Sequence, residues 1–150
     1  MAFHLHRLGL STTSLRAAGL SRDLARSVRE GRVSLGAADT AWLYQNLALD
    51  DGQLTRALTD DERAVWDFYR VSARHPVAVW QNAATAWRPH LSASDVSAVI
   101  GHSRRTIESV VAGKTRRPVL TYEPASRLAE ALHLEAGADA FISGLPPHPR

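Results

Sequence analysis

Residues 91–113 place two short amphipathic segments on either side of a glycine, and this pattern limits the possible folds more than any other feature of the chain. In the first segment Val96, Val99 and Ile100 recur at the spacing of one helix face. The segment therefore predicts a short helix that buries this face. Gly101 follows directly, and glycine commonly ends a helix because it accepts a positive φ at no steric cost.

A second helix is predicted to begin after Ser103, because serine is a strong N-cap residue. Ile107, Val110 and Val111 give this helix its inner stripe. The outward positions then carry the polar residues Arg104, Arg105, Thr106 and Ser109. The basic run Lys-Thr-Arg-Arg-Pro at 114–118 follows the helix.

This order of elements is typical of a protein that reads the major groove of DNA. The groove admits one α-helix, whose first residues reach base edges while neighbouring groups hold phosphates. The fork of an arginine can bond O6 and N7 of guanine together, so Arg104 and Arg105 favour a site that contains guanine. The alternative is a solvated basic helix face on an unrelated helical protein.

From Leu91 to about Ile142 the chain resembles the helix-turn-helix domain of lambdoid phage repressors and the wider Xre family. The residues that carry the resemblance are Leu91-Ser92, Gly101-His102-Ser103, Thr106-Ile107-Glu108, the run 113–118, and Leu128-Ala129-Glu130-Ala131-Leu132. The resemblance implies base contacts by Arg104, Arg105 and Ser109. It implies phosphate contacts by Ser92, Ser103, Thr106, Lys114, Arg116 and Arg117. The chain departs from the family at Ala93, where the family often has a glutamine that braces a backbone contact.

A fainter copy of the same pattern lies at 10–54. Leu10-Ser11 corresponds to Leu91-Ser92, Gly19 to Gly101, Gly31 to Gly113 and Leu43 to Leu128, so the offset drifts from 81 through 82 to 85 along the copy. Short insertions in turns between equivalent helices produce such a drift. We therefore interpret the chain as a tandem duplication of one helical domain.

The first copy is weaker where DNA would be read. Ala25 stands at the position of Ile107, Asp23 follows Arg22, and the basic run is missing. Its positive residues Arg22, Arg26 and Arg29 form a candidate second DNA site. Two readings stay open, a second DNA reader and a copy that binds a partner or makes a dimer.

The fold expected from these patterns is all-α, with two tandem helix-turn-helix domains of the lambda repressor type. The expected divisions are a degenerate helix-turn-helix domain at 1–58, a connecting helix at 59–75, a DNA-binding helix-turn-helix domain at 76–143 and a flexible tail at 144–150. Thr59 and Glu62 form a capping box for a helix from about 60 to 74. Its residues Val65, Trp66, Phe68 and Tyr69 would pack between the two halves or, alternatively, form a dimer surface.

Prolines mark two further helices. Pro76 opens one that Pro89 closes, with a buried face predicted at Val77, Trp80, Ala84 and Trp87. Pro124 is expected to start the helix whose inner stripe is Ala125, Leu128, Ala129 and Leu132. A last short turn is expected from Gly137 to Ile142.

Composition excludes several classes of protein. The chain of 150 residues has no cysteine, which rules out disulfides and thiolate metal sites. We expect a cytoplasmic protein, because no stretch is apolar enough to span a membrane and the N-terminus lacks the core of a signal peptide. His4 and His6 could ligate a metal only with further ligands, and the other histidines show no metal-ligand spacing. No catalytic motif is present, so neither an enzyme, a metal site nor a cofactor is expected.

The net charge of +3 is less informative than its distribution. Residues 101–118 are basic and residues 50–67 are acidic, so one region attracts phosphate and the other repels it. The expected function is a sequence-specific DNA-binding transcriptional regulator, most simply a homodimeric repressor of the phage or mobile-element type that binds double-stranded DNA. One alternative is an antitoxin that represses its own promoter and binds a toxin through the 59–75 region. Another is a protein-interaction module that kept the helix-turn-helix fold without reading DNA.

Overall fold

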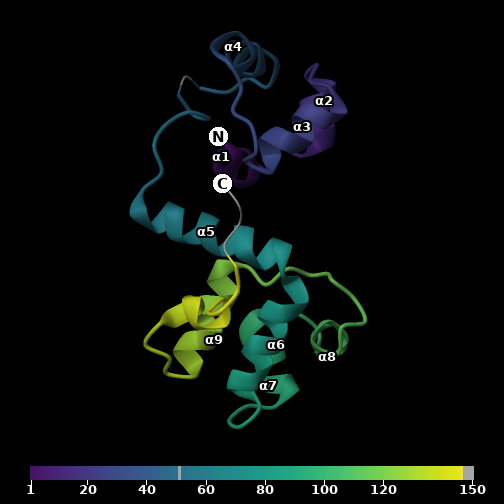
Figure 1. Ribbon diagram of the computed structural model, residues 1–150, viewed down its shortest axis with the longest axis vertical. Helices are drawn as coiled ribbons and strands as arrows, with labels where there is room; N and C mark the ends of the chain where they lie inside the picture. The colour runs from purple at the N-terminus through teal and green to yellow at the C-terminus, as the bar shows by residue number, and fades with distance from the viewer. Residues whose placement is uncertain (51, 147–150) are drawn as a thin grey trace. The chain divides into compact units, whose positions relative to one another are not determined.

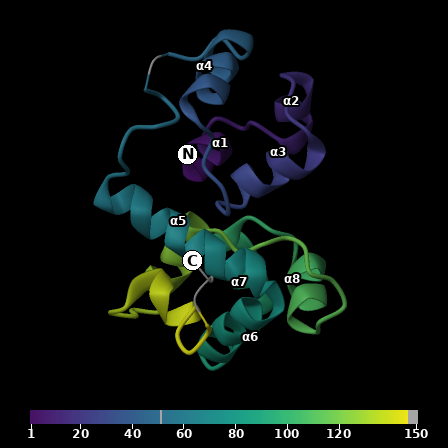
Figure 2. The same cartoon turned by 45° about the horizontal axis from the view of Figure 1, so that its top comes forward.

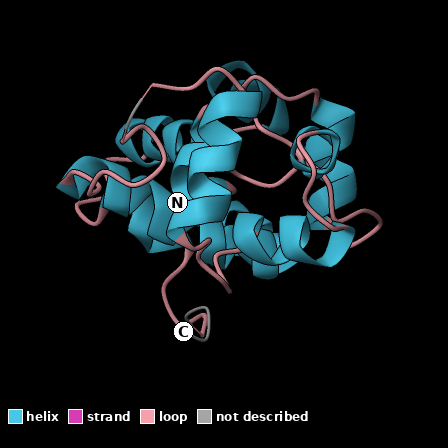
Figure 3. Ribbon diagram, turned by 90° about the horizontal axis from the view of Figure 1, so that it is seen from above, coloured by secondary structure: helices cyan, strands magenta, loops and turns pink. Residues whose placement is uncertain are grey.

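The computed structural model describes residues 1–50 and 52–146, and every regular element in them is a helix (Figure 3). The all-α expectation is confirmed. The chain divides into two compact units, one from Met1 to Leu58 and one that begins at Thr59, and each unit has a hydrophobic core of its own. Of the tail expected to be flexible, residues 147–150 lie outside the described residues.

The first unit contains four short helices (Figure 1). They are α1 (Ala2–Arg7), α2 (Thr12–Ala17), α3 (Arg22–Arg29) and α4 (Ala37–Asn46). The core of this unit is made of Leu5, Leu15, Ala18, Leu20, Ala25, Val28, Leu43 and Leu54. Small and aliphatic side chains dominate this list, and no aromatic residue is in it.

The second unit is larger and has an aromatic core. Its elements are α5 (Asp60–Arg74), α6 (Pro76–Trp87), α7 (Ala93–Ile100), α8 (Arg104–Val111), α9 (Tyr122–Ala131) and the 3₁₀ helix η1 (Gly137–Phe141). Its largest fully buried side chains are Trp80, Phe68 and Phe141. The turn expected at 137–142 is confirmed as η1.

Helix α5 is part of the core of the second unit. It has the predicted bounds and capping box, with Thr59 and Glu62 each accepting from the other's backbone N–H. It packs on α6 and α9, and the buried ring of Phe68 meets the ring of Tyr122 edge to face at 5.8 Å. The rest of the predicted stripe is less buried, because Val65 is 37% exposed and Trp66 is half-buried. The core of this unit therefore begins in α5, before Pro76.

Two details of the sequence interpretation are wrong. Val77 is half-buried, and Val79 takes the buried place expected for it. Since residues 79, 80, 83, 84 and 87 share one helical face, position 77 lies at the edge of that face. Helix α9 begins at Tyr122, two residues before Pro124. A proline fits inside a first turn because the N–H groups there have no partner within the helix.

Two helices of the first unit have counterparts of equal length in the second unit. Helices α3 and α8 are equivalent at an offset of 82, and α4 and α9 are equivalent at an offset of 85. Both α3 and α8 are capped by a serine hydroxyl, and in both a glycine with positive φ, Gly31 or Gly113, follows the C-cap residue. Among the described residues, the two non-glycine residues with positive φ, Ala48 and His133, are also equivalent at the offset of 85. The offsets found in the sequence therefore recur in the backbone.

A buried histidine lies in the core of the first unit. His4 is fully buried, and its Nε2 donates to the carbonyl oxygen of Arg56 at 3.0 Å. Its Nδ1 has no hydrogen-bond partner among the described residues. Burial lowers the pKa of the His4 imidazole, and the nearby positive charges of Arg56 and the N-terminus lower it further. A proton on Nδ1 would place an unpaired charged donor inside the core.

We therefore expect the stability of the first unit to fall in mild acid. A histidine with a lowered folded pKa contributes stability that is complete above its unfolded pKa of about 6.5 and is lost as the pH falls below that value. His4→Gln keeps an N–H donor for the Arg56 carbonyl but cannot titrate. In thermal unfolding at about pH 7.5 and pH 5.5, the melting temperature of the variant should fall less than that of the wild type. An equal fall in both chains would show that His4 is not responsible.

Candidate nucleic-acid interface

Helices α7 and α8 are joined by a turn of three residues at 101–103. Gly101 ends α7 with φ 86° and ψ 10°, a left-handed conformation that glycine adopts without strain. The hydroxyl oxygen of Ser103 then accepts from the backbone N–H of Thr106 at 3.2 Å, which confirms the predicted cap of α8. Ile107 and Val110 are buried and fix α8 against the core. Figure 2 shows α8 at one side of the second unit.

The first turn of α8 carries two exposed arginines in different states. Arg104 donates from Nε to the Oε1 of Glu108 at 2.9 Å, one turn along the helix. Arg105 makes no side-chain hydrogen bond or ion pair within the described residues, and it is exposed. Ser109, one turn further, is half-buried. Of the two arginines among the predicted base contacts, Arg105 is therefore the one that can bind without first losing a partner.

The predicted phosphate-binding hydroxyls also differ in what they can donate. Ser103 and Thr106 bond to each other through their hydroxyl oxygens at 2.7 Å, so only one of the two hydroxyl hydrogens is left for a ligand. Ser92 donates its hydroxyl and its backbone N–H to Oδ2 of Asp95, at 2.8 and 3.0 Å. These bonds lower the pKa of the Asp95 carboxyl, which stays negative. A phosphate contact by Ser92 stays a prediction, and it would require this capping box to open.

The basic loop that follows α8 is tied to the unit at both ends. The backbone N–H of Lys114 donates to the carbonyl of Ser109, and the buried indole of Trp80 donates to the carbonyl of Pro118 at 2.9 Å. Within the loop Thr115 Oγ1 bonds to both the N–H and the carbonyl of Arg117. The side chains of Lys114, Arg116 and Arg117 are exposed. Exposed positive charge therefore lies both in the first turn of α8 and just after its end.

The equivalent helix of the first unit offers less free charge. Arg22 and Arg26 are exposed, but Arg29 is half-buried and donates to Nδ1 of His6 at 3.2 Å. The other ring nitrogen of His6 donates to the carbonyl of Arg29. His6 therefore bonds to both the guanidinium and the backbone of Arg29. Exposed Asp23 lies beside Arg22 in the first turn. Of the candidate second DNA site, two arginines remain available and one is engaged inside the unit.

Sequence reasoning missed two features of this interface. The ion pair of Arg104 with Glu108 could have been found from their i, i+4 spacing. The bond from Trp80 to Pro118 spans 38 residues and leaves no local signal.

No described helix is long and apolar enough to cross a membrane. The described residues also contain no cluster of three or more histidine, cysteine, aspartate or glutamate side chains that could hold a metal ion. No protein-family model, curated protein or solved structure matches the chain.

Proposed function

We propose that the protein is a sequence-specific DNA-binding transcriptional regulator whose second unit reads the major groove with α8. The observation that carries the proposal is the state of α8 itself. The helix is capped by Ser103, held to the core by Ile107 and Val110, and presents the unpaired Arg105 in its first turn. A helix that enters the groove by its N-terminal end would bring this arginine to the base edges first.

In this proposal the two arginines have different tasks. Arg105 reads a guanine directly, because its fork is free to bond O6 and N7 together. Arg104 must exchange Glu108 for its DNA partner. The exchange costs little, since an exposed ion pair one helical turn apart contributes only about 0.3–0.5 kcal/mol. Ser109 adds a weaker contact further along the helix.

Phosphate contacts position the domain and carry no sequence information. We assign them to the exposed side chains of Lys114, Arg116 and Arg117 and to the free hydroxyl hydrogen of the pair Ser103 and Thr106. Ser92 is left out of this set, because Asp95 holds its hydroxyl and adds a negative charge.

We also propose that the two units are copies of one helix-turn-helix domain. The offsets of 82 between α3 and α8 and of 85 between α4 and α9 support a duplication, together with the serine cap and the following glycine that α3 and α8 share. In the first copy Arg29 is hydrogen-bonded to His6, and the acidic Asp23 follows Arg22 in the sequence. Its role is then to add a weak second contact or to hold a homodimer, so that two readers engage one operator as a repressor.

Nuclease footprinting on the DNA upstream of the protein's own gene tests the function. A protected segment of one or two half-sites, lost with Arg105→Ala at equal protein concentration, would support a sequence-specific regulator. A roughly palindromic footprint would support a dimer, and two unequal half-sites would support reading by both units. Protection of no segment at any salt concentration, or equal coverage of all DNA, would reject the proposal.

The assignment of phosphate contacts predicts a change in salt dependence. Replacing Lys114, Arg116 or Arg117 with alanine should weaken binding on all sequences and lower the slope of log affinity against log salt by about one, because one fewer counterion is released. The slope is measured between about 50 and 200 mM salt. Arg127→Ala is the control, since it removes an exposed charge from α9, where Arg127 lies 3.8 Å from the carboxylate of Glu123. A loop variant with the slope of the control would show that its side chain does not touch the backbone of DNA.

A further inference from the structure

The second unit has a cavity of about 340 Å³, half open to solvent, between the end of α6, the segment that leads to the start of α7, and α8. Its walls are mainly apolar and include Trp87, Leu91, Ile107 and Val111. Two alanines, at 93 and 112, also line it and leave the space open, because their side chains are too short to fill it. The volume lies in the range of small-molecule sites, which begins at about 300 Å³.

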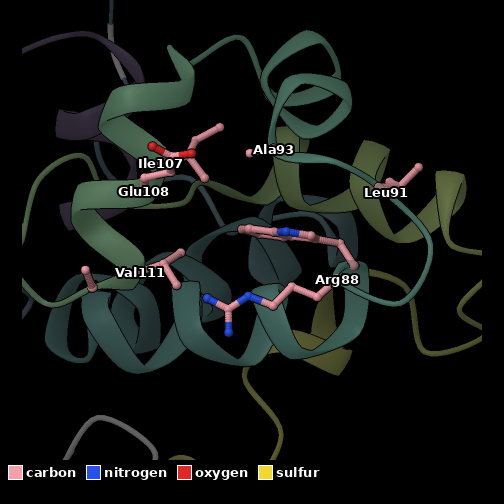
Figure 4. Close-up of a pocket in the computed structure, with 8 residues that line it drawn as sticks. Arg88, Leu91, Ala93, Ile107, Glu108 and Val111 are labelled. Carbon is pink, nitrogen blue, oxygen red and sulfur yellow. The ribbon is translucent and has the colours of Figure 1, made fainter.

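Of the two charged side chains that line the cavity, one is already paired and the other can bind a ligand. Arg88 and Glu108 are its two charged lining residues. The carboxylate of Glu108 is already held by Arg104 at 2.9 Å, so that pair is neutral overall. The exposed guanidinium of Arg88 has no side-chain partner within the described residues. Figure 4 shows the Arg88 side chain extending along the cavity toward the α8 wall that carries Val111.

We propose that this cavity binds a small aromatic carboxylate. The ring would lie against the half-buried side chains of Leu91 and Val111, with the nearly buried Trp87 and Ile107 beneath them, where removing it from water is favourable. The carboxylate would pair with Arg88, whose planar fork matches the two oxygens of a carboxylate. A cationic ligand fits less well, because the only carboxylate on the walls is engaged with Arg104. The site goes beyond the proposed function and does not require DNA, although α8 forms one of its walls.

The test uses the full chain and two probes of equal shape, 2-naphthoate and its neutral analogue 2-naphthamide. Binding is measured by isothermal titration calorimetry on the protein alone. We expect saturable binding of one naphthoate per chain, at least about fivefold tighter than naphthamide, because a hydrogen bond to a charged group is stronger than one to a neutral group.

Three variants test separately whether Arg88 binds the carboxylate and whether the apolar wall binds the ring. Arg88→Gln removes the charge and keeps most of the stem, so it should weaken naphthoate by about tenfold and leave naphthamide nearly unchanged. Ala93→Leu narrows the cavity with a good helix former and should weaken both probes. Arg127→Gln removes an exposed charge that does not line the cavity and should change neither. Circular dichroism checks that each variant is folded.

Several outcomes would overturn the proposal. They are no saturable binding of naphthoate, equal affinity for the two probes, or equal loss of naphthoate affinity in Arg88→Gln and Arg127→Gln. Because the titration contains no DNA, its result stands apart from the footprint. A chain that binds naphthoate without protecting any operator would keep this site and reject the proposed function.

Discussion

Replacing Arg105 with alanine should weaken binding to the cognate operator by about 1–3 kcal/mol and relax the base preference at one position of the site. The cost is large because Arg105 has no competing partner in the free protein, so its whole fork is available to guanine. Affinities of wild type and variant are measured on the operator, on operators with each base changed at one position, and on random DNA, all at one salt concentration.

The control for this prediction is an arginine that the proposal assigns to phosphates. Arg116→Ala should weaken binding to the operator and to random DNA by the same factor, because a phosphate contact is independent of sequence. Arg105→Ala should affect the operator far more than random DNA. If both variants lower the two affinities in parallel, Arg105 touches the backbone and another side chain reads the bases.

Local chemistry explains why the ends of α7 and α8 could be predicted closely. A serine that accepts from the N–H three residues later starts a helix by its own side chain, and Gly101 ends one by its own φ. These signals need no distant partner, so the sequence contains them in full. The same holds for the capping box of Thr59 and Glu62 at the start of α5.

Contacts between distant residues could not be predicted in this way. His6 engages Arg29 across 23 residues, which removes a cation from the candidate second DNA site. Neither residue type requires the other, since a histidine can bond to many groups. The cavity beside α8 is likewise lined by residues at the end of α6, at the start of α7 and on α8. Only the packing of these segments shows that the short side chains of Ala93 and Ala112 leave a space between them.

The capping box at the start of α7 is a local signal that the sequence interpretation did not include. Ser92 and Asp95 stand at the N-cap and N3 positions of α7, and this pairing commits the serine hydroxyl to the helix itself. The family resemblance implied a phosphate contact at the same hydroxyl. A hydroxyl has one hydrogen to donate, so the two roles compete, and the carboxylate next to it disfavours an approaching phosphate.

Replacing Phe68 with alanine should destabilise the second unit by about 3–5 kcal/mol, because truncating a buried aromatic side chain removes its burial and leaves a cavity. Phe68 is fully buried on α5 and touches Tyr122 of α9, so it joins the first helix of the unit to the last α-helix. Val65→Ala on the same helix is the matched control. Its side chain is 37% exposed, and we expect a change within about 0.5 kcal/mol.

Urea unfolding of both variants, followed by tryptophan fluorescence, measures the difference. Three of the four tryptophans, at 66, 80 and 87, belong to the second unit, so its transition dominates the signal. A loss of several kcal/mol in Phe68→Ala alone means that any fragment made to test DNA binding must begin at Thr59. A fragment that begins at Pro76 would lack the Phe68 ring and should unfold. If instead the two variants lose equal stability, α5 only connects the units, and the core of the second unit is complete without it.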